Sequence, residues 1–487
     1  MLAAVTNSPY AGWLNPGDNT WQLVAATLVG LMSLPGIAVL YGGLVQRKWV
    51  VNTMLMAFAG FSLVLLVWIL WAYNMGFSSR PWDLFGAKSG FFYNLVGQPK
   101  PITSPLGEQA QATSLAQTLI PFHFPNATLA YFQVVFAAIT PLLFLGSVIG
   151  RMKFKAWLVF VPLWITFVYA VNAKLLWGGG WFAMKGAVDY SGGYVIHLAA
   201  GVTGFTLAAI LGPRLQRDKA HGVPNNLMMC AVGAGILWLG WNGFNGGDPF
   251  YAGADAASAV LNTNVATAAG LLTWMVMDML VSRERKPTFL GAINGMICGL
   301  VAITPSAGWV NGYGAIIVGL VASAVVWVAW NFLSRVRPFS KVDDALGVVY
   351  THGIAGLLGG LLVGFLADPG MIEYLGVGKS PAVSVNGLFY TGSWHQEWEQ
   401  FLAAVWIIVF TAAMTAILAY VTKFVVRGLR EPAEVLEVGD VAIHDEEAYP
   451  QETFAERVSA LSASAERMVA AGTTAEGART DRAPERL

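Results

Sequence analysis

Long apolar runs, separated by short polar loops, dominate the first 425 residues of the chain. A helix that crosses the hydrocarbon core of a membrane needs about 20 mostly apolar residues, and hydropathy in windows of that length predicts eleven such helices. The eighth run is the weakest because it is short and rich in glycine. The pattern predicts an all-α polytopic membrane protein with spans at Trp21–Val45, Val50–Met75, Ala127–Gly150, Ala156–Trp177, Ser191–Gly212, Asn226–Gly246, Ala257–Val281, Thr288–Thr304, Gly314–Leu333, Ala345–Ala367 and Phe401–Val425.

Basic residues in the loops predict how these spans are oriented. Cytoplasmic loops carry an excess of Lys and Arg, and here five alternate short loops hold fourteen basic residues, whereas the other five loops hold five. We therefore expect a multi-pass protein of the cell (inner) membrane with its N-terminus outside and its C-terminus in the cytoplasm. The predicted division is an external lead-in at 1–20, a transmembrane domain at 21–425 and a cytoplasmic tail at 426–487, in which 452–470 is expected to be a short helix.

Composition narrows the class of protein further. Only 11% of the residues are charged and 56% are apolar, whereas soluble domains carry about 25% charged residues, which excludes a soluble enzyme. The formal net charge is zero, so no global field favours a nucleic-acid partner. Cys230 and Cys298 both lie inside apolar runs, which argues against a disulfide framework and a cysteine metal site. No cofactor or metal is expected.

A short motif occurs twice, in spans that are predicted to run in opposite directions. His197–Gly204 and His352–Gly359 both read H-x-x-A-G-x-x-G, in spans five and ten. This spacing predicts two inverted five-helix repeats, at about 21–212 and 226–367, plus a final helix at about 401–425. The small residues after each histidine would let the two helices approach closely.

The two histidines are the first candidates for chemistry. A histidine inside a membrane span is costly unless it is neutral and paired, or lines a path for protons or substrate. One reading is a structural hydrogen bond between helices. Another is a facing imidazole pair in a narrow pore, because neutral imidazoles each donate and accept. A metal site is the third reading, but no nearby Cys or carboxylate completes the ligand set of His197 and His352.

Aromatic residues gather at the predicted outer ends of several spans. Phe136, Trp177 and Asp248 all fall there, the last two beside glycine runs. Aromatic faces attract a cation by about 0.5–2 kcal/mol each, and a carboxylate adds to that attraction. An aromatic belt at the membrane interface is the ordinary alternative, but the glycines indicate close backbone packing around a vestibule.

Several motifs, in order along about residues 20–450, resemble those of the ammonium transporter family (Amt/Mep/Rh), and specifically a bacterial Amt-type transporter. The motifs are Pro35–Leu44, Trp177–Gly180 followed by Asp189–His197, Gly240–Asn245, Thr304-Pro305, Val342–Asp344 followed by His352-Gly353, and the tail from Gly428 through His444, Glu446, Ala448 and Tyr449. The resemblance implies an eleven-helix homotrimer that carries ammonium/ammonia. It also implies a tail resembling the family's docking element for PII-type signalling proteins.

The resemblance implies roles for the outer residues. Phe136 and Trp177 match the external recruitment site, which Asp248 would complete. Many members have Ser at the position of Asp248, so the acid is a departure that would strengthen cation capture or slow release. Asp189 matches a carboxylate that orders the vestibule.

The resemblance also implies roles deeper in the molecule. Phe136 and Phe244 match the stacked phenyl gate, and Trp241 matches a pore-wall residue. His197 and His352 match the pore pair. The expected mechanism is deprotonation of ammonium above an apolar pore, passage of ammonia, and net proton transfer. A Rh-like neutral gas channel, an ammonium sensor or receptor, and a membrane enzyme are the alternatives. The chain has no nucleophile, metal set or phosphate loop of an enzyme.

Overall fold

The computed structural model describes residues 11–82, 86–87, 89–115, 119–220, 223–374 and 382–449. The helix expected at 452–470 lies outside these residues. Within them, ten helical segments are long and apolar enough to cross a membrane, and one shorter apolar helix joins them. The predicted helical polytopic fold is therefore confirmed, and the apolar run that looked weakest is the short helix α14 (Phe289–Ile303).

The eleven segments follow the predicted spans closely. Several are built from an α-helix continued by a π-helical turn. In chain order they contain α1 (Pro16–Leu31), η1 (Met32–Ile37) and α2 (Ala38–Leu44); η2 (Arg47–Trp49), α3 (Val50–Val67), η3 (Trp68–Ala72) and α4 (Tyr73–Phe77); α6 (Asn126–Val148); α7 (Phe154–Trp164), η4 (Ile165–Tyr169), α8 (Ala170–Leu176) and α9 (Trp181–Lys185); η5 (Gly193–Leu198) and α10 (Ala199–Leu211); α12 (Leu227–Gly246); α13 (Ala254–Leu280); α14 (Phe289–Ile303); α15 (Gly312–Asn331); η8 (Val349–Ile354) and α16 (Ala355–Leu366); and α18 (His395–Val425).

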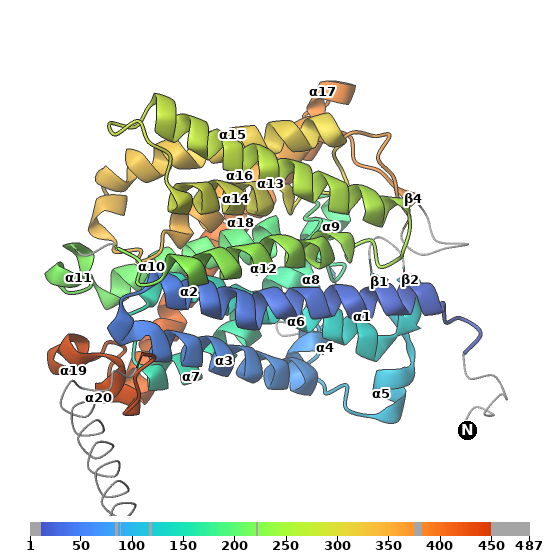
Figure 1. The fold of residues 1–487 in the computed structure, drawn as a ribbon. Helices are drawn as coiled ribbons and strands as arrows, with labels where there is room; N and C mark the ends of the chain where they lie inside the picture. Colours follow the sequence, from blue (N-terminus) through green and yellow to red (C-terminus); the bar gives the residue numbers. More distant parts are fainter. Residues whose placement is uncertain are drawn as a thin grey trace, which may run out of the picture.

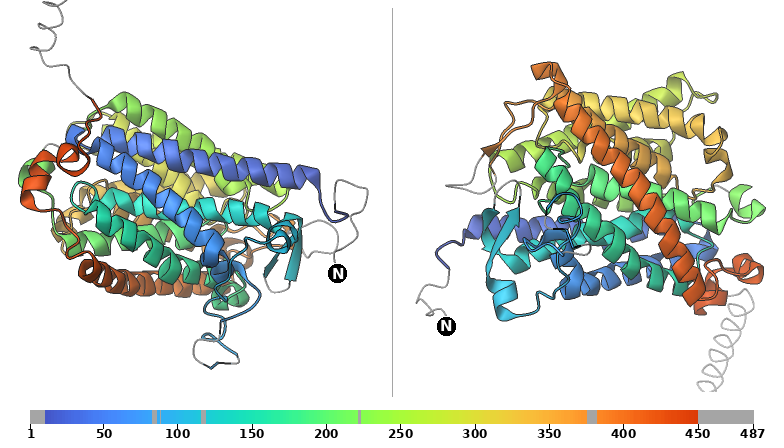
Figure 2. Two further views of the ribbon diagram at one scale, coloured as in Figure 1. Left: turned by 90° about the horizontal axis from the view of Figure 1, so that it is seen from below. Right: turned by 180° about the vertical axis from the view of Figure 1, so that it is seen from behind.

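The bundle has two distinct ends (Figure 1). At one end lie α11 (Gln216–Ala220), α19 (Ala433–Val438) and α20 (Asp440–His444). Lys48 pairs with Asp218 of α11, and Arg151 donates a hydrogen bond to the backbone oxygen of Gly212, shortly before α11. We call this end the basic end. The opposite end, which we call the loop end, carries α5 (Pro105–Gln109), α17 (Leu388–Thr391) and the strands. Figure 2 shows α18 running obliquely across the back of the bundle between the two ends.

The loop end contains strands that the sequence did not predict. β1 (Gln111–Leu115) pairs antiparallel with β2 (Leu119–Pro125), and β3 (Glu373–Tyr374) pairs antiparallel with β4 (Ala382–Val383). These two-stranded ribbons lie in loops between the spans, and each is too short to give a membrane-spanning hydropathy signal. They give the loops at this end a fixed backbone.

Two helix ends also differ from the predicted boundaries. The first helix begins at Pro16 because the Asn15 side chain accepts hydrogen bonds from the N–H groups of Gly17 and Asp18, which caps it. The last begins at His395 rather than Phe401, with polar residues in its first two turns. Both helices extend past the apolar run from which their limits were predicted.

The two histidine-bearing segments cross where glycines allow backbone contact. A Cβ added to Gly201 in α10 would lie 2.2 Å from the Cα of Gly353 in η8. A Cβ on Gly356 would lie 2.6 Å from the carbonyl oxygen of Gly193. Because the opposing atoms belong to backbone, they cannot rotate away. The repeated glycines thus hold His197 and His352 at the centre of the bundle.

The tail packs against the basic end. Both carboxylate oxygens of Asp440 accept backbone hydrogen bonds at the start of α3, from Val51 at 2.8 Å and Asn52 at 2.9 Å. Nε2 of His444 lies 3.0 Å from Oδ1 of Asn52. The carboxylate satisfies N–H groups that the first turn of a helix leaves without partners. The described part of the tail is therefore docked on the bundle.

Candidate functional site

A cavity of about 720 Å³ opens at the loop end, and we call it the outer cavity. Trp177, Asp189, Asp248 and Glu373 all line it. The Trp177 indole is fixed because its Nε1 donates a 2.6 Å hydrogen bond to the backbone oxygen of Asp189. The cavity therefore combines an oriented aromatic side chain with several carboxyl groups.

Two phenyl rings close the inner side of this cavity. The ring centroids of Phe136 and Phe244 are 4.5 Å apart, and Phe136 meets Trp177 edge-on at 6.4 Å. Both phenylalanines are fully or almost fully buried. Passage between them requires the rings to rotate, so the pair has the geometry of a gate.

The histidines lie directly beyond these rings. His197 stacks on Phe244, Trp241 and His352, with ring centroids 5.8, 5.4 and 5.4 Å apart. The Nδ1 atoms of His197 and His352 are 3.4 Å apart. Nε2 of His197 is buried and has no hydrogen-bond partner among the described residues. One ring nitrogen thus bonds the other histidine while a second is free for a ligand.

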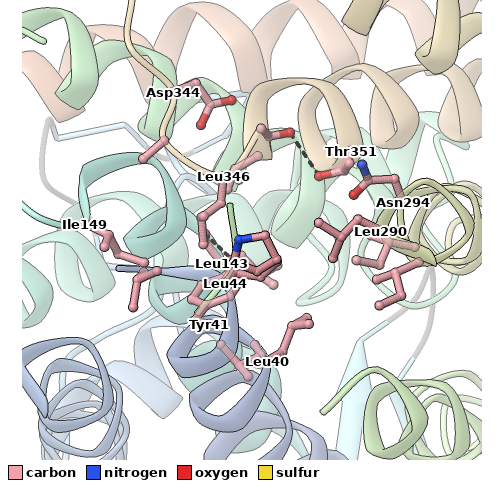
Figure 3. Close-up of a pocket in the computed structure, with 18 of the residues that line it drawn as sticks. Leu40, Tyr41, Leu44, Leu143, Ile149, Leu290, Asn294, Asp344, Leu346 and Thr351 are labelled. Carbon is pink, nitrogen blue, oxygen red and sulfur yellow. Dashed lines mark hydrogen bonds between the residues drawn. The ribbon is translucent and has the colours of Figure 1, made fainter. Parts of the chain in front are cut away.

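A second cavity, of about 270 Å³, begins at His352 and leads toward the basic end; we call it the inner cavity. Trp241 also lines it, held by a 2.8 Å hydrogen bond from its Nε1 to Oγ1 of Thr304. Figure 3 shows many aliphatic side chains around the space, with Asp344 at one side. The lining also includes the charged residues Arg214, Asp218 and Lys219. The labelled aliphatic residues are Leu40, Leu44, Leu143, Ile149, Leu290 and Leu346.

The two histidines have matching carboxylates eight residues before them. Asp189 accepts backbone hydrogen bonds from Gly192, Tyr194 and Val195 at the start of η5. Asp344 likewise accepts one from Val349 at the start of η8. The inverted repeat therefore includes an aspartate that caps each π-helical turn. Burial raises the pKa of Asp189 to about 6, although the hydrogen bonds from the backbone N–H groups at the start of η5 lower it.

Asp248 faces the outer cavity rather than bulk solvent. It is 7% exposed, and its carboxylate accepts a hydrogen bond from Oγ of Ser191. Burial, with Glu373 and Asp189 as further negative neighbours, raises its pKa well above the ordinary value. A cation in the cavity would reverse that shift, because it stabilises the ionised form.

The structure brings every predicted site residue to one path through the bundle. Phe136, Trp177, Asp248 and Asp189 lie at or beside the outer cavity, and the other four continue inward. Sequence reasoning missed Glu373, since it stands in a polar loop. It also missed the role of Asp344, although the eight-residue spacing to His352 repeats that of Asp189 and His197. In the described part of the chain, no three His, Cys, Asp or Glu side chains gather as a metal site would need.

Comparison with known proteins assigns the family. Residues 20–449 match the model of the Ammonium Transporter Family. The chain belongs to the ammonium transporter family. A transporter family implies a protein that is not an enzyme.

Relatives and solved structures agree with this membership. The chain is 44% identical over 447 residues to "Ammonium transporter 3 member 2" of Oryza sativa, covering 91% of this chain and 92% of that protein. It is 43% identical over 445 residues to "Ammonium transporter 2" of Arabidopsis thaliana, covering 90% and 89%. The crystal structure of Saccharomyces cerevisiae Mep2 matches with a TM-score of 0.75 and 28% identity, over 91% and 94%. These sequence relatives are plant proteins, so the narrower expectation of a bacterial transporter gains no support.

Proposed function

We propose that this protein recruits ammonium in the outer cavity, removes a proton from it, and conducts ammonia past His197 and His352, with net proton transfer. One observation carries the proposal. The histidine pair lies between an outer cavity whose described lining has three acids and no Lys or Arg, and an inner cavity in which two acids are balanced by Arg214 and Lys219 among many aliphatic side chains. The outer cavity suits a cation, whereas the inner cavity disfavours one.

The arrangement supports a specific order of events. Trp177, Phe136 and Asp248 replace part of the hydration shell of the ion, which is how a site selects among cations. Desolvation beyond the phenyl gate then favours the neutral form of an amine. The ion loses one N–H proton, and an imidazole can take a proton at one nitrogen and release another from its second. Potassium has no proton to lose and is therefore excluded.

Placement and assembly form part of the same proposal. The basic residues of the loops support an external N-terminus, a transmembrane domain at 21–425 and a tail at 426–487 inside the cell, in the inner membrane. The family resemblance supports a homotrimer and a PII-type partner at the tail. The docked tail gives such a partner a surface continuous with the bundle.

Flux into proteoliposomes tests the proposal against its alternatives. The purified protein is reconstituted, and ammonium uptake is followed after a concentration step. We expect saturable uptake above that of empty liposomes, unaffected by potassium. A receptor or an enzyme would bind ammonium without such uptake. Uptake that does not saturate and follows the concentration of neutral ammonia alone would instead indicate a gas channel.

A further inference from the structure

Glu373 lines the outer cavity but has no role in the proposed mechanism. It lies in β3, between the tenth and eleventh spans, and is only 6% exposed. Among the described residues its carboxylate has no hydrogen-bond or ion-pair partner, and it lines the outer cavity. A buried carboxylate without a partner is costly, and burial, with the charge of Asp255, raises the pKa of Glu373 well above its ordinary value. A cation bound beside it would lower that pKa and stabilise the ionised form.

The backbone around Glu373 is held in place. The Asp255 carboxylate, at the start of α13, accepts hydrogen bonds from the N–H of Tyr374 at 3.1 Å and of Ala256 at 2.9 Å. β3 also pairs with β4. The neighbouring acid Asp255 thus holds the strand in place, and Glu373 is the acid of this strand that lines the cavity.

Other unpaired polar groups line the same cavity. The hydroxyl of Tyr190, Nε1 of Trp309 and Oε1 of Gln133 are buried without hydrogen-bond partners among the described residues. The Tyr190 and Trp309 rings meet edge-on, with centroids 5.8 Å apart. Tyr190, Glu373 and Asp248 all line this cavity. Burial, then the charges of Glu373 and Asp248, raise the pKa of Tyr190.

These groups fit a small monovalent cation that keeps some of its water. The Glu373 carboxylate and the hydroxyl of Tyr190 accept hydrogen bonds, whereas Nε1 of Trp309 only donates and needs a water to accept from it. A water molecule occupies about 30 Å³ in the liquid, so a cavity of about 720 Å³ has room for an ion with water. Divalent metals need more oxygen ligands than this wall offers.

We propose that Glu373, with Tyr190 and Trp309, forms a second ammonium subsite in the outer cavity, which holds the ion before it reaches Trp177 and Phe136. This inference rests on the proposed function. Asp248 lines the same cavity as Glu373, Tyr190 and Trp177, and its charge raises the pKa of Tyr190. It therefore connects the new subsite with the recruitment site.

The test is the ammonium dependence of transport by Glu373→Gln, which keeps the shape of the side chain and removes its charge. We expect the half-saturating ammonium concentration to rise roughly 3- to 10-fold, as loss of one partly screened charge implies, with maximal flux nearly unchanged. Glu373→Asp should restore most of the affinity. Glu108→Gln, an exposed acid in α5 at the same end, is the matched control and should leave half-saturation unchanged.

The outcomes separate this inference from the proposed function. No uptake by the wild-type protein would contradict the proposed function. Wild-type uptake with equal half-saturation in Glu373→Gln would overturn the subsite alone, as would an equal shift in Glu108→Gln. If Glu373→Gln does not yield folded protein, Tyr190→Phe decides, because it removes only the hydroxyl. We then expect a rise of roughly 2- to 4-fold, and an unchanged value would overturn the subsite.

Discussion

The outer and inner cavities of this transporter differ in both size and lining. The outer cavity, about 720 Å³, contains the carboxyl groups of Asp189, Asp248 and Glu373. The inner cavity, about 270 Å³, begins at His352, and its many aliphatic side chains are joined by two acids, Asp218 and Asp344, and two bases, Arg214 and Lys219, whose charges balance. Such a difference favours a charged species on one side of the histidines and a neutral one on the other. In the proposed mechanism, the proton therefore leaves at the barrier between the cavities.

Removing either imidazole should have the largest effect on ammonium uptake, because the histidines separate the two cavities. His197→Ala and His352→Ala each interrupt the ring-to-ring path that separates the cavities. We expect ammonium uptake to fall to that of empty liposomes, or the selectivity over potassium to be lost. Uptake assays in proteoliposomes check this, with thermal unfolding as the control for folding. Two variants with wild-type flux and selectivity would show that the pore lies elsewhere.

Forcing the two histidine helices apart should have the next largest effect. Gly201→Ala places a methyl group 2.2 Å from the Cα of Gly353, and overpacking of this kind costs about 1–3 kcal/mol. We expect a lower unfolding temperature and reduced uptake.

Gly235→Ala is the matched control, because a Cβ there meets nothing within 4 Å in α12. It should be neutral or slightly stabilising, since Ala favours a helix over Gly by about 0.5–1 kcal/mol. If the unfolding temperatures of the two variants match, close packing at Gly201 is not what positions the histidines.

Neutralising Asp248 should change affinity rather than block the path. Asp248→Asn and Asp248→Ser remove a charge from the outer cavity, so half-saturation should rise roughly 3- to 10-fold. The shift should shrink in high salt. Because burial, Glu373 and Asp189 raise the pKa of Asp248, the wild-type group is ionised mainly at higher pH. The difference between wild type and Asp248→Asn should therefore grow as pH rises.

Measuring half-saturation against pH and ionic strength checks this prediction. The Asp248 carboxylate also accepts a hydrogen bond from Ser191, so a purely structural acid is the competing reading. Half-saturation that stays at the wild-type value in both variants, at every pH, would favour that reading.

The smallest effect is expected from a substitution in the docked tail at the basic end, which should change local stability. Asp440→Ala removes the carboxylate that caps α3 through Val51 and Asn52, and loss of such a cap costs about 0.5–2 kcal/mol. We expect faster hydrogen exchange in residues 433–449. Glu434→Ala, an exposed acid in α19, is the control and should exchange like the wild type. Equal exchange in the two variants would mean that Asp440 does not hold the tail.

The sequence predicted the helical bundle well because the length of an apolar run is a strong signal for a membrane-spanning helix. Apolar length located the eleven helical segments, and the repeated motif predicted that His197 and His352 meet. The roles of Phe136, Trp177 and Asp248 as a recruitment site stay predictions.

What the sequence could not predict depends on contacts between distant segments. Glu373 reaches the outer cavity only because Asp255 and β4 hold its strand there. Nothing in the polar loop itself distinguishes this acid from an exposed one. The role of Asp344 had a signal in the sequence, because its spacing to His352 repeats that of Asp189 to His197.

The most direct test of the central claim is the current on a supported membrane that carries the reconstituted protein, after a step in ammonium or potassium concentration. Deprotonation at the histidine barrier with net proton transfer predicts a saturable current with ammonium, none with equal potassium, and loss of the ammonium current in His197→Ala. A potassium current equal to that of ammonium would contradict selection by deprotonation. Ammonium uptake without any current would contradict net proton transfer.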